Sequence, residues 1–165
     1  MHPRLLVLAL GLACGAALAQ SDVEWKEAEA PAPPALQTQK LIAVEVAGSQ
    51  LRWGVDPASI RIGPDRVVRY VVVGLGEAGA INALYEGLRC DTGEAKVYAR
   101  QSRDGGWVKS SADWKTVHNN SATRHSLAIA RAGACAGEAP NTSAEQIARD
   151  LAAPHGEYRF RNEVR

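Results

Sequence analysis

The run at residues 66–73 constrains the fold of this chain more than any other stretch of its sequence. It contains five valines, a tyrosine and two arginines, and β-branched and aromatic residues favour strands. Successive side chains of a strand point to opposite faces of a sheet, and here both faces receive apolar side chains. We therefore predict a strand that lies centrally in its sheet.

Further short strands are predicted on both sides of this run, separated by turn residues. Residues 80–89 alternate at the period of two that a strand imposes. Asp and Gly within 91–94 and 103–106 provide the side-chain hydrogen bond and the positive φ that tight turns need. Pro57 after Asp56 interrupts strand pairing. The other predicted strands are 41–46, 51–55, 95–100 and one that begins at Trp107.

Two helices are predicted in the C-terminal third of the chain. Residues 122–132 follow a candidate cap at Asn120 or Ser121. Residues 142–151 begin with a Thr or Ser cap ahead of Glu and Gln, and this helix must end before Pro154. The sequence thus predicts an α+β fold, a mostly antiparallel sheet of about five or six strands with one or two C-terminal helices against a face.

The first residues have the features of a cleavable secretory signal in the required order. Arg4 is followed by an apolar run at 5–12 and by small residues that end at Ala19. The apolar stretch is shorter than the roughly 20 residues that a membrane span needs. We predict a signal peptide at 1–19, cleavage after Ala19, no transmembrane span in the mature chain, and a periplasmic protein.

Cys14 leaves a second possibility open. Bacterial lipoproteins are cut directly before a cysteine that carries the lipid, usually with leucine three positions upstream. Here Leu12 lies one position too close to Cys14. Ordinary cleavage after Ala19 is therefore favoured, and lipid anchoring through Cys14 is the alternative.

Removal of the signal leaves 146 of the 165 residues and takes away one basic side chain, Arg4, so that 18 basic residues face 18 acidic ones. A formal charge of zero gives no electrostatic basis for binding nucleic acid. The mature chain keeps Cys90 and Cys135, and a single pair of cysteines in an oxidising compartment most simply forms a disulfide. Free or catalytic thiols are the alternative to this Cys90–Cys135 bridge.

Composition divides the mature chain into three parts. Residues 20–40 are rich in Pro and Ala and poor in apolar side chains, which predicts a semi-rigid, mostly extended segment. Within it, Trp25 either docks onto the domain or stays exposed. Residues 41–153 carry the α+β domain, which is long enough for its own core. Residues 154–165 form a charged tail.

Several stretches of this sequence resemble one known family. They are residues 67–70, 79–90 and 92–99, followed by Trp107 and Trp114, and they resemble the cryptic neisserial protein (CNP-one-like) family of proteobacterial envelope proteins. The resemblance extends from about residue 25 to 151. It implies a periplasmic or lipid-anchored envelope protein built around one domain, and it brings no established activity or ligand with it.

The block at 85–90 reproduces the family's pattern most clearly and supplies the first candidate site. Glu86 and Arg89 are three residues apart, so on a regular strand they point to opposite faces unless a bulge at Gly87 brings them together. The alternative is a salt bridge or a solvated sheet face. The candidate binding residues are Tyr70, Tyr85, Glu86, Arg89 and Trp107.

No motif in the sequence points to a catalytic residue, a metal site or a cofactor. His118, His125 and His155 lack metal-binding spacing, and the glycines at 74–79 have no helix after them to hold a phosphate. Trp53, Trp107 and Trp114 fit either a binding groove or a small core beneath the sheet.

Three functions remain as hypotheses. The first is a non-catalytic interaction or accessory module that acts on another envelope protein or on the cell wall, which predicts an exposed apolar patch near a sheet edge. The second is a hydrolase of an envelope component that uses Glu86, which requires this carboxylate to lie in a pocket. The third is a small-ligand-binding periplasmic protein, which needs a cavity beside the sheet.

Overall fold

A computed structural model describes residues 24–153 of the chain. These residues form one antiparallel sheet with strand order β1-β2-β4-β5-β6-β7, while β3 pairs with β4 and β8 pairs with β6. The strands are β1 (Ile42–Val44), β2 (Arg52–Val55), β3 (Arg61–Ile62), β4 (Val68–Leu75), β5 (Ile81–Arg89), β6 (Glu94–Gln101), β7 (Trp107–Lys109) and β8 (Lys115–Thr116). The predicted α+β class and the mostly antiparallel sheet are confirmed.

The predicted central strand is β4, which is hydrogen-bonded along its length to β5 and also to β2 and β3. All of its residues except Leu75 are buried. Val68, Tyr70 and Val72 face one side of the sheet, and Val71 and Val73 face the other. Because both faces of β4 are apolar, each face of the sheet has to be covered.

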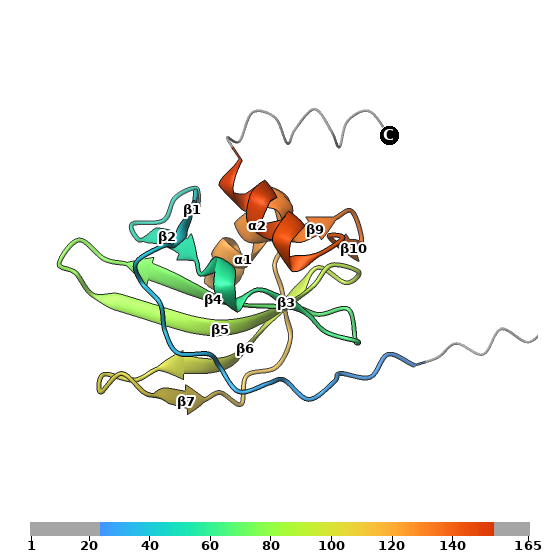
Figure 1. Cartoon of the computed structure of the whole chain (residues 1–165), viewed down its shortest axis with the longest axis horizontal. Coiled ribbons are helices and arrows are strands. Elements are labelled where there is room, and N and C mark those ends of the chain that lie inside the picture. The colour runs from blue at the N-terminus through green and yellow to red at the C-terminus, as the bar shows by residue number, and fades with distance from the viewer. Residues whose placement is uncertain (1–23, 154–165) are drawn as a thin grey trace, which may run out of the picture.

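Helices cover the first face. They are α1 (Arg124–Ile129), which continues into a wider π-type turn at Ala130–Ala134, and α2 (Ala144–Ala152). A small hairpin of β9 (Cys135–Ala136) and β10 (Ala139–Pro140) joins them. In Figure 1 these orange and red elements gather on one side of the sheet. We call them the helical layer.

The helix predicted at 122–132 is thus shorter and irregular. Asn120 caps a 3-10 turn at Ser121–Thr123, and its side chain accepts a hydrogen bond from the Ala122 amide. At the other end Gly133 has a φ of 140°, and a Cβ there would lie 2.5 Å from that of Asp150 on α2. The chain must therefore leave helical geometry where it meets α2. The second predicted helix begins as expected, since the Ser143 hydroxyl accepts from the Gln146 amide.

The N-terminal segment covers the second face. Its described part, from residue 24 to 40, contains no helix or strand, and Leu36 and Leu41 pack against the cluster of Val71, Val73 and Tyr85. Figure 1 shows this blue segment running along the sheet toward β6 and β7. Of the two alternatives for Trp25, the structure shows the docked one, because the indole Nε1 donates to the Asp65 carbonyl at 3.0 Å.

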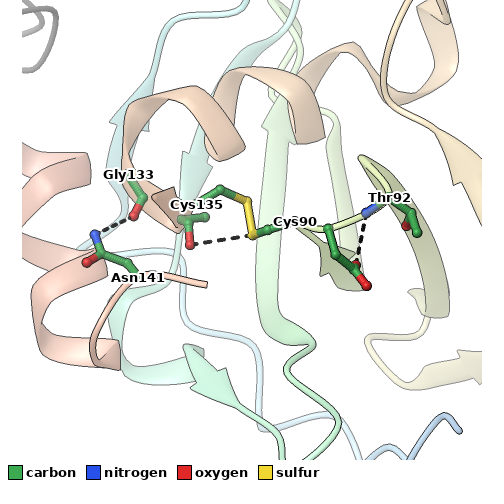
Figure 2. The surroundings of a disulfide bond; sticks show 7 residues. Cys90, Thr92, Gly133, Cys135 and Asn141 are labelled. Atoms are coloured by element: carbon green, nitrogen blue, oxygen red, sulfur yellow. Dashed lines mark hydrogen bonds between the residues drawn. A yellow bond between two sulfur atoms is a disulfide. The ribbon is translucent and has the colours of Figure 1, made fainter. Parts of the chain in front are cut away.

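The predicted disulfide joins the sheet to the helical layer. Cys90 directly follows β5 and Cys135 begins β9, with their Cα atoms 5.6 Å apart and a separation of 45 positions in sequence. Figure 2 shows the bridge, and beside it the Asn141 side chain that donates to the Gly133 carbonyl at 2.8 Å. The predicted Cys90–Cys135 pair is confirmed.

Among the described residues, no helix is long and apolar enough to cross a bilayer. The predicted signal peptide with its cleavage site after Ala19, the alternative lipid site at Cys14 and the charged tail at 154–165 lie outside the described residues.

Candidate functional site

The structure divides the five predicted binding residues between the two faces of the sheet. Tyr70 and Glu86 are directly opposite each other in the β4–β5 pair and face the helical layer. Tyr85 faces the N-terminal segment, together with Trp107, and Arg89 stacks there on Trp25. Glu86 and Arg89 therefore point to opposite faces, as the alternation of a regular strand predicts.

A bulge does occur beside these residues, but not at Gly87. The register of β5 against β6 shifts between Tyr85 and Glu86, and Tyr98 is the extra residue on β6. From Gly87 onward the pairing is regular. The lack of a side chain at Gly87 serves another purpose, because a Cβ there would lie 2.7 Å from the ring of Tyr98.

Glu86 is a buried carboxylate with three hydrogen-bonding neighbours. It is 2% exposed. Oε1 lies 2.8 Å from His125 Nε2, and Oε2 accepts from the Ser126 hydroxyl at 3.1 Å and from the Tyr70 hydroxyl at 3.4 Å. Burial and the neighbouring Glu86 carboxylate hold the pKa of Tyr70 well above its usual value, so this hydroxyl remains a donor. These donors offset the cost of removing the carboxylate from water.

His125 is fixed on a second side by an aromatic ring. Its imidazole stacks on Trp53 of β2 with centroids 4.3 Å apart and an interplanar angle of 7°. Trp53 is itself oriented by a hydrogen bond from Nε1 to the Ser49 hydroxyl at 2.8 Å. The ring of His125 is thus held in place by Glu86 at one nitrogen and by Trp53 across its plane.

This group borders a cleft of about 310 Å³ between the sheet and the connection that leads into α1. Its buried wall includes Glu86 and His125, with half-buried Trp53 beside them, and its exposed wall includes Arg100, Asp113 and Lys115. Within the described part of the chain, these three exposed charges form no salt bridge. The cleft therefore offers charges of both signs to a ligand.

The edge of the sheet continues this surface. Val108 of β7 pairs with Arg100 of β6, so the two side chains lie on the same face. Val108 is 57% exposed. This single valine is the nearest match to the apolar edge patch that the interaction-module hypothesis predicts.

Sequence reasoning missed Ser126 and Arg100 and did not place His125 in this site, whereas Trp53 was named as one of the tryptophans that fit either a binding groove or a core. His125 was considered only as a metal ligand, and within residues 24–153 no group of three or more His, Cys, Asp or Glu side chains could hold a metal ion. One signal was present in the sequence, because Glu86 shares its strand face with Leu84 and Leu88. A carboxylate on an apolar face requires buried donors, although the sequence does not say which ones.

The arrangement is suited to binding. Both oxygens of Glu86 already accept hydrogen bonds, so this carboxylate orients His125 instead of facing a ligand alone. His125 borders the cleft beside unpaired charges of both signs. Such a site can bind a small polar molecule through complementary charge and hydrogen bonds.

Comparisons with known proteins give one match. A family model described as the CNP1-like family matches residues 20–152. No curated protein matches the chain, and no solved structure does so either.

Proposed function

The chain belongs to the CNP1-like family, and from that premise we propose that it is an exported, non-catalytic binding module of the bacterial cell envelope. Its binding site is the cleft that Glu86, His125 and Trp53 border. Its ligand is a small zwitterion of the amino-acid or short-peptide type. The proposal concerns the cleft alone and does not involve the opposite face of the sheet.

The observation that carries this proposal is a rigid, buried group beside unpaired surface charges. His125 is held by Glu86 at 2.8 Å and by the ring of Trp53 at 4.3 Å. A ligand that meets this wall encounters groups that need no rearrangement, which lowers the cost of binding. Arg100 and Lys115 suit an anionic group, and Asp113 suits a cationic one. A zwitterion satisfies both.

Export is supported by the disulfide and by the sequence pattern of residues 1–19. A Cys90–Cys135 bridge is typical of proteins that fold outside the cytoplasm. Mass spectrometry of the mature protein tests the compartment and the anchor together. A chain that begins at Gln20 supports cleavage after Ala19, whereas a lipid on Cys14 contradicts it.

The ligand class can be tested by titrating the protein with a panel of free amino acids and dipeptides, with acetate and methylammonium as single-charge comparisons. We expect changes in amide chemical shifts around His125 and Trp53 for the zwitterions. Arg100→Ala should weaken that binding by roughly tenfold or more, since one charge contact is lost. Arg103→Ala is the matched control, because Arg103 is exposed and lies outside the cleft. Equal binding of the single-charge compounds, or an effect of Arg103→Ala as large as that of Arg100→Ala, contradicts the proposal.

Hydrolysis of an envelope component is a second candidate, favoured by one observation. Glu86 and His125 lie 2.8 Å apart beside the cleft, which is the spacing of an acid–base pair. The hydrogen bonds that already engage Glu86 place this candidate second. Incubation with purified peptidoglycan, with Glu86→Gln as the control, tests it. Release of soluble fragments that Glu86→Gln abolishes supports hydrolysis, and no release contradicts it.

A further inference from the structure

The N-terminal segment turns one side toward the second face of the sheet at every third residue. Ala30, Pro33 and Leu36 are half-buried, and the residues between them are exposed. A polyproline II helix has three residues per turn, so one of its three sides recurs at this spacing. The stretch from residue 30 to 36 therefore lies on the sheet by one side and leaves its other two sides open to solvent.

The sequence of this stretch explains its conformation. It reads Ala-Pro-Ala-Pro-Pro-Ala from residue 30 to 35. Each proline fixes its own φ at about −65°, and each residue that precedes a proline is restricted to the extended region. Most of the stretch is thus confined to polyproline II geometry, which needs no internal hydrogen bonds. Little conformational entropy is lost in keeping it, because the unfolded chain already favours it.

Contacts at both ends hold this helix against the domain. On its N-terminal side, the Ala28 carbonyl accepts a hydrogen bond from Arg69 at 3.1 Å. On its C-terminal side, the Pro34 carbonyl accepts from Trp107 Nε1 at 2.9 Å, and Leu36 packs against the apolar cluster of the second face. The helix is therefore displayed in a defined position and is more than a spacer.

The open sides of the helix carry a regular pattern. Pro31 and Pro34 are both exposed and lie three residues apart, so their rings follow one another along the same side of the helix. We call these two residues the proline ridge. The hydrogen bond that fixes Pro34 engages its carbonyl. Two prolines at this spacing on a polyproline II helix are the pattern that domains with aromatic-lined grooves recognise.

A charge beside the ridge narrows the kind of groove that fits. Glu29 is exposed two residues before Pro31 and is the charged residue nearest to the ridge in sequence. Within residues 24–153 it forms no salt bridge. A groove with an acidic rim would repel this carboxylate, whereas a basic residue at the end of the groove would attract it.

We propose that the proline ridge docks into a second protein of the cell envelope, in a groove that is lined by aromatic side chains and has a basic residue at one end. The ridge fills the groove, and the basic residue pairs with Glu29. A helix that is formed and held before binding loses little conformational entropy when the partner arrives. The inference takes only the compartment from the proposed function. It is independent of the cleft, which lies on the other face of the sheet.

Site-specific photocrosslinking in the bacterium that makes the chain finds this partner. The full-length chain carries the photoreactive residue p-benzoylphenylalanine in place of Ala32, which is exposed beside the ridge. The same replacement of Ala78, exposed in the loop between β4 and β5, is the control. We expect one protein to be linked from position 32 and not from position 78. The absence of such a product overturns the proposal.

The linked protein is then identified, purified and titrated with the full-length chain. Pro31→Ala/Pro34→Ala should raise the dissociation constant about tenfold or more, because both residues that fill the groove are lost. Glu29→Lys should raise it several-fold at low salt. Thr38→Ala is the matched control, since Thr38 is exposed beyond the ridge, and should bind as the unmodified chain does.

Competition tests the chemistry of the groove directly. Decaproline, which forms the same helix, should displace the chain from the purified partner, and a decapeptide of glycine and serine should not. Binding that decaproline leaves unchanged overturns the proposal.

Two further measurements separate loss of the ridge from loss of structure. The indole ¹H–¹⁵N signal of Trp107 reports whether the helix stays docked, and it should not change in these variants. The variant P31A/A32P keeps three prolines but moves one off the ridge, and it should bind as weakly as Pro31→Ala/Pro34→Ala. If the Trp107 signal changes in the latter, P31A/A32P and Glu29→Lys decide the result. Undiminished binding by the variants that remain docked overturns the proposal.

Discussion

Glu86 occupies a position where its neighbours on the strand face, Leu84 and Leu88, are buried and apolar. It is tolerated there because His125, Ser126 and Tyr70 surround its two oxygens. A buried carboxylate stabilises a fold only while its donors are present, and its donors in turn need the carboxylate.

Glu86→Ala should therefore lower the free energy of unfolding by about 2–4 kcal/mol, since it leaves buried donors without an acceptor. Glu86→Gln keeps the shape and one acceptor oxygen and should cost about 1 kcal/mol. Urea denaturation measures both values. Glu45→Ala is the control, because Glu45 is exposed and its loss should change stability by less than about 0.5 kcal/mol. Equal effects at Glu86 and Glu45 would show that the buried network contributes nothing.

A second prediction follows from the lack of room for a side chain at Gly87. A Cβ at this position would lie 2.7 Å from the Tyr98 ring and 2.9 Å from the Val67 side chain, and both distances are shorter than a normal contact. Gly87→Ala should destabilise the protein by about 1–3 kcal/mol through overpacking. Gly106→Ala is the control, since its nearest neighbour would lie at 3.5 Å.

A double-mutant cycle with Tyr98→Ala tests whether the contact with Tyr98 causes the loss of stability in Gly87→Ala. If the clash with Tyr98 is responsible, Gly87→Ala should cost much less once this ring is absent. An unchanged cost would assign the effect to the backbone or to Val67 instead.

For single residues, the sequence predicts the direction of a side chain better than it predicts which side chain it contacts. Alternation along β5 places Glu86 and Arg89 on opposite faces, and the structure agrees. It does not identify His125, which is 39 residues away in sequence, because only tertiary packing brings α1 over that point of the sheet. The sequence raised a bulge at Gly87 only as the condition for bringing Glu86 and Arg89 to one face. The bulge that occurs lies at Tyr98 on β6, since the register depends on the partner strand as much as on β5 itself.

Among the elements, the segment at residues 24–36, which we call the strap, has a composition that predicts its conformation but not where it binds. Its prolines and few apolar residues predict an extended conformation, and the described part has no helix or strand. Composition also suggests that such a segment buries too little surface to be held. The segment is nevertheless held on the domain, because specific hydrogen bonds are made by Trp25, Glu27 and Pro34.

The strap should detach in acid. Burial tends to raise the pKa of Glu27, but the hydrogen bonds from Lys96, Tyr98 and Trp114, with the charge of Lys96, together outweigh it and hold the pKa below the ordinary 4.5. A carboxyl whose pKa is lowered on folding stabilises the bound strap above pH 4.5, and this contribution is lost as the pH falls through the lowered value. Burial tends to raise the pKa of Asp65 as well, but the hydrogen bonds from Arg69 and from the Ala28 and Val67 amides, with the charge of Arg69, together outweigh it and lower the pKa.

The indole ¹H–¹⁵N signals of Trp25 and Trp114 in a pH titration measure this release. Glu27→Gln should shift the midpoint of this titration and reduce the dependence of strap release on pH. The part of that dependence that is due to Asp65 should remain. A titration curve that is identical for Glu27→Gln and for the unmodified chain would assign the pH dependence elsewhere.

For the molecule as a whole, local patterns predict the sheet and its class, whereas the layers on each side depend on long-range contacts. The order β4-β5-β6-β7 follows from consecutive hairpins whose turns are visible in the sequence. The cleft is different, because it is bordered by β2, β5, β6 and the residues before α1. No single stretch of sequence describes a surface that is assembled from four distant ones.

The disulfide is the covalent link between two of these layers, and its removal should loosen one layer more than the other. Cys90 continues the central hairpin of β4 and β5, whereas Cys135 lies in the helical layer, which otherwise packs on the sheet through apolar side chains such as Ile129 and Ile147. Closure of a 45-residue loop contributes roughly 3–4 kcal/mol through the unfolded state.

Reduction should therefore lower the free energy of unfolding by about that amount, and amide hydrogen exchange should accelerate in α1 and α2 before it does in β4 and β5, because the sheet keeps its own hydrogen-bond ladder. The Cys90→Ala/Cys135→Ala variant should reproduce this behaviour and should not respond to reductant, which serves as the control. If α1 and α2 exchange at the same rate with and without the bridge, side-chain packing alone holds the helical layer to the sheet, and the bridge acts only on the unfolded chain.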